Sequence, residues 1–181
     1  LRVVDKMYTK GVSSVLDYSV EGKEEEAQFD AALNMTLKTI EFAREREAIP
    51  FAVFKPTGFG RLALYEKVGD KAPLTENEQK EWNRVIERFD IACKTAFEKD
   101  VLLLIDAEES WMQDAADVIV TDMMRKYNKQ KAIVFNTLQM YRWDRLDYLK
   151  NLHEQAKSEG FYIGMKLVRG AYMEKENDRA T

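Results

Sequence analysis

The sequence predicts an α/β fold in which parallel strands alternate with helices. Five short apolar runs are separated by longer stretches whose apolar residues recur every three or four positions, which is the pattern of strands alternating with amphipathic helices. The runs are almost continuously apolar, as in strands covered on both faces. Right-handed crossovers then leave two architectures, an open doubly wound sheet or the first five strands of a (β/α)8 barrel.

The predicted strands share a short apolar run, and the predicted helices share one apolar stripe. The strands are residues 13–20, 51–55, 101–106, 132–140 and 162–168. The helices are residues 23–47, 75–98, 111–127 and 144–159. In the first helix, Phe29, Leu33 and Leu37 lie on the stripe, and Pro50 follows where the helix has ended.

The connection between the second and third strands is the longest and predicts a helical insertion. It opens with a loop that contains Gly58, Gly60, Gly69 and Pro73. Thr75 and Glu78 then form a capping box, in which each side chain binds a backbone N–H at the helix start. Cys93 falls on the apolar stripe of this helix, so we expect a core residue rather than a nucleophile. Gly160 is the expected stop of the last helix.

Composition excludes several classes of protein. The 28 Lys and Arg residues against 32 Asp and Glu give a net charge of −4, which argues against a basic nucleic-acid interface. With 45% apolar and 33% charged residues, the chain is typical of a soluble globular protein. The longest apolar run has five residues, far short of the roughly 20 that span a bilayer. A single Cys and a single His exclude an internal disulfide and a zinc cluster, which favours an intracellular protein.

Length sets a limit on the barrel. A closed (β/α)8 barrel typically takes about 250 residues, whereas this chain has 181. The first residue is Leu1 rather than Met. We therefore expect residues 1–181 to be one partial domain of a longer protein.

Polar side chains end all five predicted strands. They are Glu21, Lys55, Asp106, Gln139 and, on the last strand, Lys166 with Arg169. Because ligands of parallel α/β folds bind at the carboxyl ends of the strands, we expect these side chains to line a concave binding site that carries both positive and negative charges.

Each of these residues also has a structural interpretation. Lys55 could extend from a strand end into solvent. Asp106 could cap the following helix, although Ser110 is better placed for that role. Gln139 could bind a loop as readily as a ligand. The acidic run 24–26 is expected to be a solvated first helical turn, and His153 lies on a helix away from any strand end.

Two cations, carboxylates and an amide fit an anionic cofactor with a small charged substrate, and Gly170 and Ala171 allow close backbone approach. The chain has no Gly-x-Gly-x-x-Gly and no P-loop motif. A lysine at a barrel strand end can instead form a Schiff base. From the residues alone, a lyase or aldolase using Lys55 or Lys166 and a non-enzymatic binding domain are therefore alternatives.

Three segments together resemble strand-end motifs of the proline dehydrogenase family, in the same order. They are Phe-Ala-Val-Phe-Lys-Pro-Thr-Gly at 51–58, Leu-Ile-Asp-Ala-Glu-Glu at 104–109 and Lys-Leu-Val-Arg-Gly-Ala-Tyr at 166–172. Residues 16–22 also resemble the first barrel strand of the family's monofunctional branch. The resemblance covers essentially the whole chain.

The resemblance implies a flavoenzyme on a (β/α)8 TIM-type barrel, of which about the first five strands are present. Such an enzyme oxidises L-proline to Δ1-pyrroline-5-carboxylate with FAD and passes electrons to a membrane quinone. Three residues match catalytic positions of the family. Lys55 matches the active-site lysine beside the substrate, Asp106 an aspartate that helps to hold the substrate-binding residues, and Glu21 a glutamate that pairs with a substrate-binding arginine. The implied cofactor-binding positions are Gln139, Lys166, Val168, Arg169, Gly170 and Ala171.

The match departs from the family in two places. Bifunctional bacterial members read Arg-Leu-Val-Lys-Gly-Ala-Tyr, so Lys166 and Arg169 exchange the two cations, which differ in shape and hydrogen bonding. The paired arginines that hold the substrate carboxylate in the family, on its last barrel helix, do not occur here. We expect the fragment alone to be inactive. The family also implies a cytoplasmic protein peripheral to the inner membrane in bacteria, or a mitochondrial one in eukaryotes.

Overall fold

The computed structural model describes residues 2–17 and 22–181. Its strands are β1 Leu16–Asp17, β2 Phe51–Phe54, β3 Leu102–Ile105, β4 Val134–Gln139 and β5 Met165–Val168. Its helices are α1 Arg2–Tyr8, α2 Glu26–Arg44, α3 Leu62–Gly69, α4 Glu76–Lys99, α5 Ser110–Tyr127, α6 Arg145–Glu159 and α7 Met173–Ala180, with a 3₁₀ turn η1 at Pro56–Gly58.

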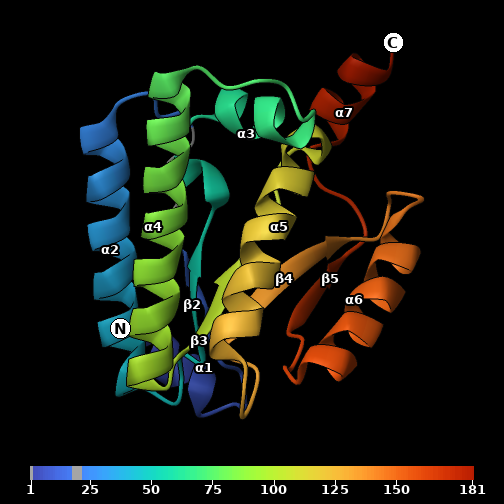
Figure 1. Ribbon diagram of the computed structural model, residues 1–181. Coiled ribbons are helices and arrows are strands. Elements are labelled where there is room, and N and C mark those ends of the chain that lie inside the picture. The colour runs from blue at the N-terminus through green and yellow to red at the C-terminus, as the bar shows by residue number, and fades with distance from the viewer. Residues whose placement is uncertain (1, 18–21) are drawn as a thin grey trace.

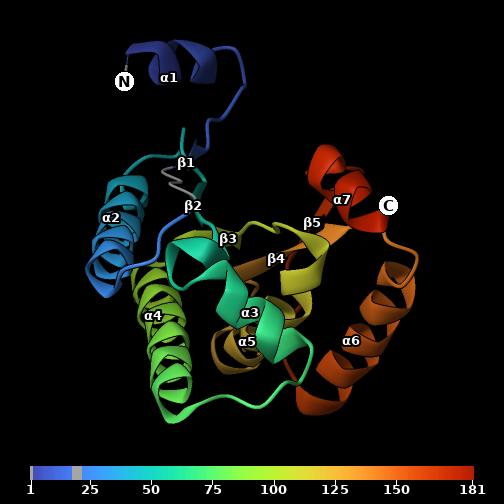
Figure 2. The ribbon, with the colours of Figure 1, turned by 90° about the horizontal axis from the view of Figure 1, so that it is seen from above.

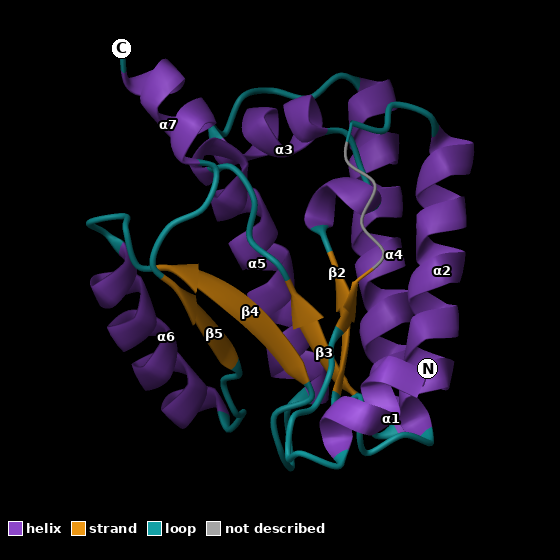
Figure 3. Cartoon of the chain, turned by 180° about the vertical axis from the view of Figure 1, so that it is seen from behind, coloured by secondary structure: helices purple, strands orange, loops and turns teal. Residues whose placement is uncertain are grey.

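The five strands form one parallel sheet in the order β1-β2-β3-β4-β5. Helices α2, α4, α5 and α6 follow one another along one face of this sheet (Figure 1), and the strands stand in front of them when the molecule is seen from behind (Figure 3). A doubly wound sheet has helices on both faces and a strand order that reverses. Sequential strands with helices on one side instead form the wall of a barrel, here not closed.

The core lies between the sheet and the helices. Ala52, Phe54, Leu103 and Ile105 belong to the buried cluster beneath the helices, and the alternating residues of the same strands face the other side. The ring of Phe54 stacks on Phe59 with centroids 4.4 Å apart. These contacts fix the end of β2, which is the strand that Lys55 follows.

Several sequence-based expectations are confirmed. Thr75 and Glu78 make both bonds of the capping box at the start of α4. Cys93 is fully buried in the core. Gly160 ends α6 in the left-handed region with φ +70°, where an L side chain would be strained.

Other elements differ from the expectation. The first strand, expected over 13–20, is limited to Leu16 and Asp17 among the described residues. The expected glycine loop contains α3, whose buried Tyr65 donates to the carbonyl of Pro56 at 2.7 Å. Figure 2 shows α3 crossing above α5 at the end where the strands finish. Helices α1 and α7 were also not expected. Neither helix buries a residue, so neither sequence carries the apolar stripe by which helices are predicted.

The acidic start of α2 is not simply solvated. Glu26 binds Arg84 through two hydrogen bonds of 2.8 and 2.9 Å and also pairs with Arg88, both on α4. These contacts, the Arg84 hydrogen bond foremost, lower the pKa of Glu26 to about 2. Glu26 lies in the first turn of α2 with its side chain 41% exposed, as expected, but it also pairs with α4, whose charges the local sequence does not reveal.

Candidate functional site

The carboxyl ends of the strands meet at one edge of the sheet, and the expected polar residues lie there. Lys55 directly follows β2, Asp106 directly follows β3, and Gln139 is the last residue of β4. In the β4–β5 register, Thr137 pairs with Lys166 and Gln139 pairs with Val168. Parallel register therefore brings together side chains from four neighbouring strands.

Asp106 and Lys166 form an ion pair across this edge. Lys166 Nζ contacts Asp106 Oδ1, with side-chain exposed fractions of 35% and 22%. Thr137 supports the pair from β4, since its hydroxyl donates to the carbonyl of Ile105 at 2.9 Å and lies 3.5 Å from Asp106 Oδ1. Arg169 is exposed and follows the strand. Lys166 is therefore the cation that faces the cluster.

Lys55 contacts the end of the fifth strand. Its Nζ donates to the hydroxyl of Tyr172 at 3.2 Å and lies 5.8 Å from the centre of the Tyr172 ring. Tyr172 has a left-handed backbone, with φ +56°, at the start of α7. This backbone is uncommon for a residue other than glycine and is found at functional positions. Tyr172 ends the motif at 166–172, but the motif alone does not predict this contact with Lys55.

Gln139 is buried with one polar atom left over. The residue is 1% exposed. Its Nε2 donates to the hydroxyl of Tyr141 at 2.8 Å and to the backbone carbonyl of Glu108. Its Oε1 has no hydrogen-bond partner among the described residues. A buried acceptor without a partner is costly, so Oε1 is the atom of this cluster best suited to a donor on a ligand.

Glu108 is a buried carboxyl group that the sequence analysis did not assign. It is 1% exposed and accepts two hydrogen bonds from Thr57, one from the backbone N–H and one from the hydroxyl. Burial raises the pKa of Glu108 to about 7, against the opposing effect of these hydrogen bonds. The sequence offered one signal for Glu108 as a site residue, which is its position two residues after Asp106 at the end of the same strand.

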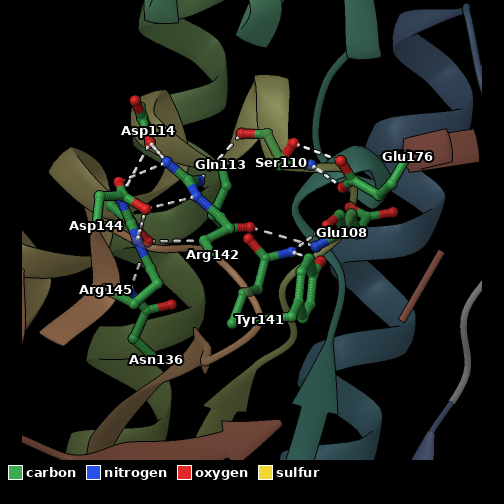
Figure 4. Close-up of polar contacts among 12 residues, drawn as sticks. Glu108, Ser110, Gln113, Asp114, Asn136, Tyr141, Arg142, Asp144, Arg145 and Glu176 are labelled. Carbon is green, nitrogen blue, oxygen red and sulfur yellow. Dashed lines mark hydrogen bonds and ion pairs between the residues drawn. The ribbon is translucent and has the colours of Figure 1, made fainter. Parts of the chain in front are cut away.

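Ser110 does not cap α5 in the expected way. The N-cap is Glu109, and no side chain of that residue caps the helix. Instead Glu176 of α7 accepts from Ser110 N at 2.8 Å and from Ser110 Oγ at 2.7 Å, a contact visible in Figure 4. The cap comes from 66 residues along the chain, so a local sequence pattern could not predict it.

The remaining expected residues are less informative. Glu21 lies outside the described residues. Gly170 is exposed and Ala171 half-buried after β5. His153 is exposed on α6, as expected for a residue away from the site. In the described part of the chain no cluster of His, Cys, Asp or Glu could hold a metal ion.

A small cavity of about 160 Å³ opens at the strand ends. Its lining includes Thr57, Glu108, Glu109 and Lys175. A larger cavity of about 450 Å³ lies between α5 and α6 on the helical side, lined by residues such as Tyr148. The smaller cavity is lined by Thr57 and Glu108 but not by Lys55, Asp106, Gln139 or Lys166. We place the site where those four side chains gather, because ligands of parallel α/β folds bind at the carboxyl ends of the strands.

Comparison with known proteins identifies relatives that match between about three fifths and nine tenths of the chain. The carbapenem antibiotics biosynthesis protein CarD of Pectobacterium carotovorum subsp. carotovorum is 39% identical over 166 residues, which are 92% of this chain and 44% of CarD. Mitochondrial proline dehydrogenase 1 of Drosophila melanogaster is 47% identical over 107 residues, 59% of this chain and 16% of that protein. The human mitochondrial proline dehydrogenase 1 is 41% identical over 63% of this chain and 20% of its own length. The chain thus spans less than half of these relatives.

Solved structures share the fold. The crystal structure of proline utilization A from Bdellovibrio bacteriovorus, inactivated by N-propargylglycine, matches 99% of this chain and 20% of that chain, with a TM-score of 0.80 and 17% identity. The likeness confirms the predicted partial TIM-type barrel. A family model described as proline dehydrogenase matches residues 1–181. The chain therefore belongs to the proline dehydrogenase family.

Proposed function

We propose that the full-length protein oxidises L-proline to Δ1-pyrroline-5-carboxylate with FAD as cofactor. The observation that carries the proposal is the buried Gln139 Oε1, an acceptor without a partner among the described residues, at the same carboxyl edge of the sheet as the Asp106–Lys166 pair. Cofactor sites of parallel barrels lie at that end. Membership of the family supports the same reaction.

The residues at this edge fit a flavin. Gln139 Oε1 offers an acceptor for a ring N–H, and Lys166 offers a positive charge at the same edge of the sheet. Val168, Arg169, Gly170 and Ala171 would complete the cofactor site from the end of β5. When bound, the flavin supplies N5 as the acceptor for a hydride from the proline ring carbon next to nitrogen, and the electrons then pass to a quinone. Protein charge near the ring stabilises electron density that arrives there.

Lys55 and Asp106 would act on the substrate side. L-proline is a zwitterion, so its carboxylate needs cations and its ammonium must lose a proton before a hydride can leave. Lys55, held by Tyr172 at 3.2 Å, supplies a positive charge for the carboxylate. Asp106 pairs with Lys166. Its negative charge therefore partly offsets the positive charge that Lys166 would present to the substrate and the cofactor. Glu21 would pair with an arginine of the segments outside this chain.

The proposal includes more of the protein than residues 1–181. This chain would be the first part of a barrel whose last strands and carboxylate-binding arginines lie on a further segment. Electron transfer to a quinone would need the full-length protein to reach a membrane surface as a peripheral protein. In the described residues no helix is both long and apolar enough to span a bilayer.

The test uses purified full-length protein. We expect a visible flavin spectrum and, with L-proline and a quinone analogue, formation of the ring imine, detected by its coloured adduct with o-aminobenzaldehyde. Borohydride trapping of a substrate carbonyl on Lys55 or Lys166, without bound flavin, would instead identify a Schiff-base enzyme. Protein without flavin, trapping or turnover would contradict both enzymatic interpretations.

A further inference from the structure

Two buried polar residues of α5 connect the helical layer to the strand end that carries Gln139. Gln113 and Asp117 are 1% and 4% exposed, and Gln113 Nε2 donates to Asp117 Oδ1 at 2.8 Å. Figure 4 labels Gln113 on α5 and Glu108 among the polar contacts of this region. Neither residue has a role in the proposed flavin or proline contacts.

The carboxylate of Asp117 accepts hydrogen bonds from two further side chains. Arg145 donates to its Oδ2 at 2.6 Å, and Asn136 donates to its Oδ1 at 2.9 Å. Burial raises the pKa of Asp117, while the charged guanidinium of Arg145 favours the ionised form. An ionised carboxylate only accepts hydrogen bonds. Gln113 must therefore turn its amino group toward Asp117.

With its amino group turned toward Asp117, Gln113 presents its oxygen to the Glu108 peptide and holds that peptide in place. Its Oε1 accepts from the backbone N–H of Glu108 at 3.2 Å. The carbonyl of Glu108 accepts from Gln139 Nε2. Because a carbonyl cannot donate, the amino group of Gln139 faces Glu108, and its oxygen is left without a partner among the described residues.

We propose that Gln113 and Asp117 are positioning residues, which hold the Glu108 peptide where its carbonyl binds the Gln139 amino group, so that the amide oxygen is offered to the flavin. The inference rests on the proposed function, in which the flavin is the ligand of Gln139. It adds that the group bound there must be a hydrogen-bond donor. The imide N–H is the one N–H of an oxidised flavin ring system, so the flavin meets this requirement through that group.

The test measures FAD binding by the apo form of the full-length protein. Gln113→Met keeps the volume of the side chain and removes both of its hydrogen bonds. We expect its Kd for FAD to rise about ten-fold, the equivalent of one buried hydrogen bond, and the visible flavin spectrum to shift. Gln113→Leu carries the same expectation, so a failure of either variant to fold leaves the test intact.

Asn128→Ala is the matched control. Asn128 is a buried amide that binds both Val134 and Tyr162 near the opposite end of β4. We expect this variant to lose thermal stability but to keep the Kd and spectrum of the wild type. If the Gln113 variants bind FAD as tightly as Asn128→Ala, the positioning role is wrong while the proposed function stands. If the wild type binds no FAD, the proposed function fails and this inference with it.

Discussion

Thr57 and Glu108 join the ends of two neighbouring strands inside the proposed site. The Thr57 backbone N–H lies 2.8 Å from Glu108 Oε2, and the Thr57 hydroxyl lies 2.7 Å from Oε1. The same Glu108 residue binds Gln139 through its carbonyl. Glu108, which is 1% exposed, therefore supports the β2 end through its carboxyl group and the amide expected to bind the flavin through its backbone carbonyl.

This buried carboxyl group predicts a pH dependence of stability. Its pKa is about 7 in the folded protein, against roughly 4.3 in an unfolded chain. The folded state then binds the extra proton, so the contribution is fully present below about pH 4 and is lost as pH rises toward 7. We expect Glu108 to lower the free energy of unfolding by up to about 1.4 kcal/mol per pH unit in that window.

Urea unfolding of the full-length protein and of Glu108→Gln, from about pH 5 to about pH 7, checks this expectation. Glutamine has the same shape and does not titrate, so the variant should have a flatter pH dependence. Identical slopes for the two proteins would show that Glu108 is already ionised at pH 5.

Two arginines of α4 bind the same carboxylate but differ in burial. The Arg88 side chain is 5% exposed and Arg84 is 42% exposed, and both contact Glu26. Arg88 also donates to the carbonyl of Phe59 at 3.0 Å. We expect Arg88→Leu to lower the free energy of unfolding by about 3 kcal/mol. Arg84→Leu should cost less than about 1 kcal/mol. If chemical denaturation showed equal losses in the free energy of unfolding for the two variants, burial would not explain the difference expected between Arg88 and Arg84.

The contact between Glu176 and Ser110 predicts how α7 is held. Removing a cap of this kind costs about 1 kcal/mol, so Glu176→Ala should raise hydrogen exchange of residues 173–180 by about five-fold. Glu174→Ala, an exposed residue of the same helix, is the control and should leave exchange unchanged. Exchange that is equally slow in both variants would show that α7 is held by other contacts.

The roles of Lys166 and Arg169, the two exchanged cations at the end of the fifth strand, can be distinguished by substitution. Lys166 contacts Asp106, whereas Arg169 is exposed. We expect Lys166→Met to slow flavin reduction about ten-fold or more and Arg169→Met to have the smaller effect, because only the first places its charge in the cluster. Stopped-flow measurement of flavin reduction checks the order, and a larger effect at Arg169 would reverse the assignment.

Much of the fold could be predicted from local patterns. The apolar runs of β2 and β3 and the capping box at Thr75 depend only on neighbouring residues, and the structure has them within one or two positions. Helix α7 could not be found in this way. Its sequence lacks an apolar stripe, and it is held by distant ion pairs such as Lys175 with Glu109.

The site was predictable in position but not in detail. Strand ends in a parallel sheet must meet at one edge, so Asp106 and Gln139 could be grouped from sequence. Their partners depend on side-chain direction across strands: Asp106 pairs with Lys166, and Gln139 binds the carbonyl of Glu108. Such pairings are set by tertiary packing, which spacing along the chain does not encode.

The most direct test of the proposed site is anaerobic flavin reduction by L-proline in the full-length protein. The wild type should lose its visible flavin absorption when proline is added. Lys55→Met and Asp106→Ala should keep FAD but react about 100-fold less efficiently, equivalent to roughly 2.7 kcal/mol of transition-state stabilisation. Near wild-type efficiency with normal flavin content in both variants would contradict the assignment of these strand ends to the active site.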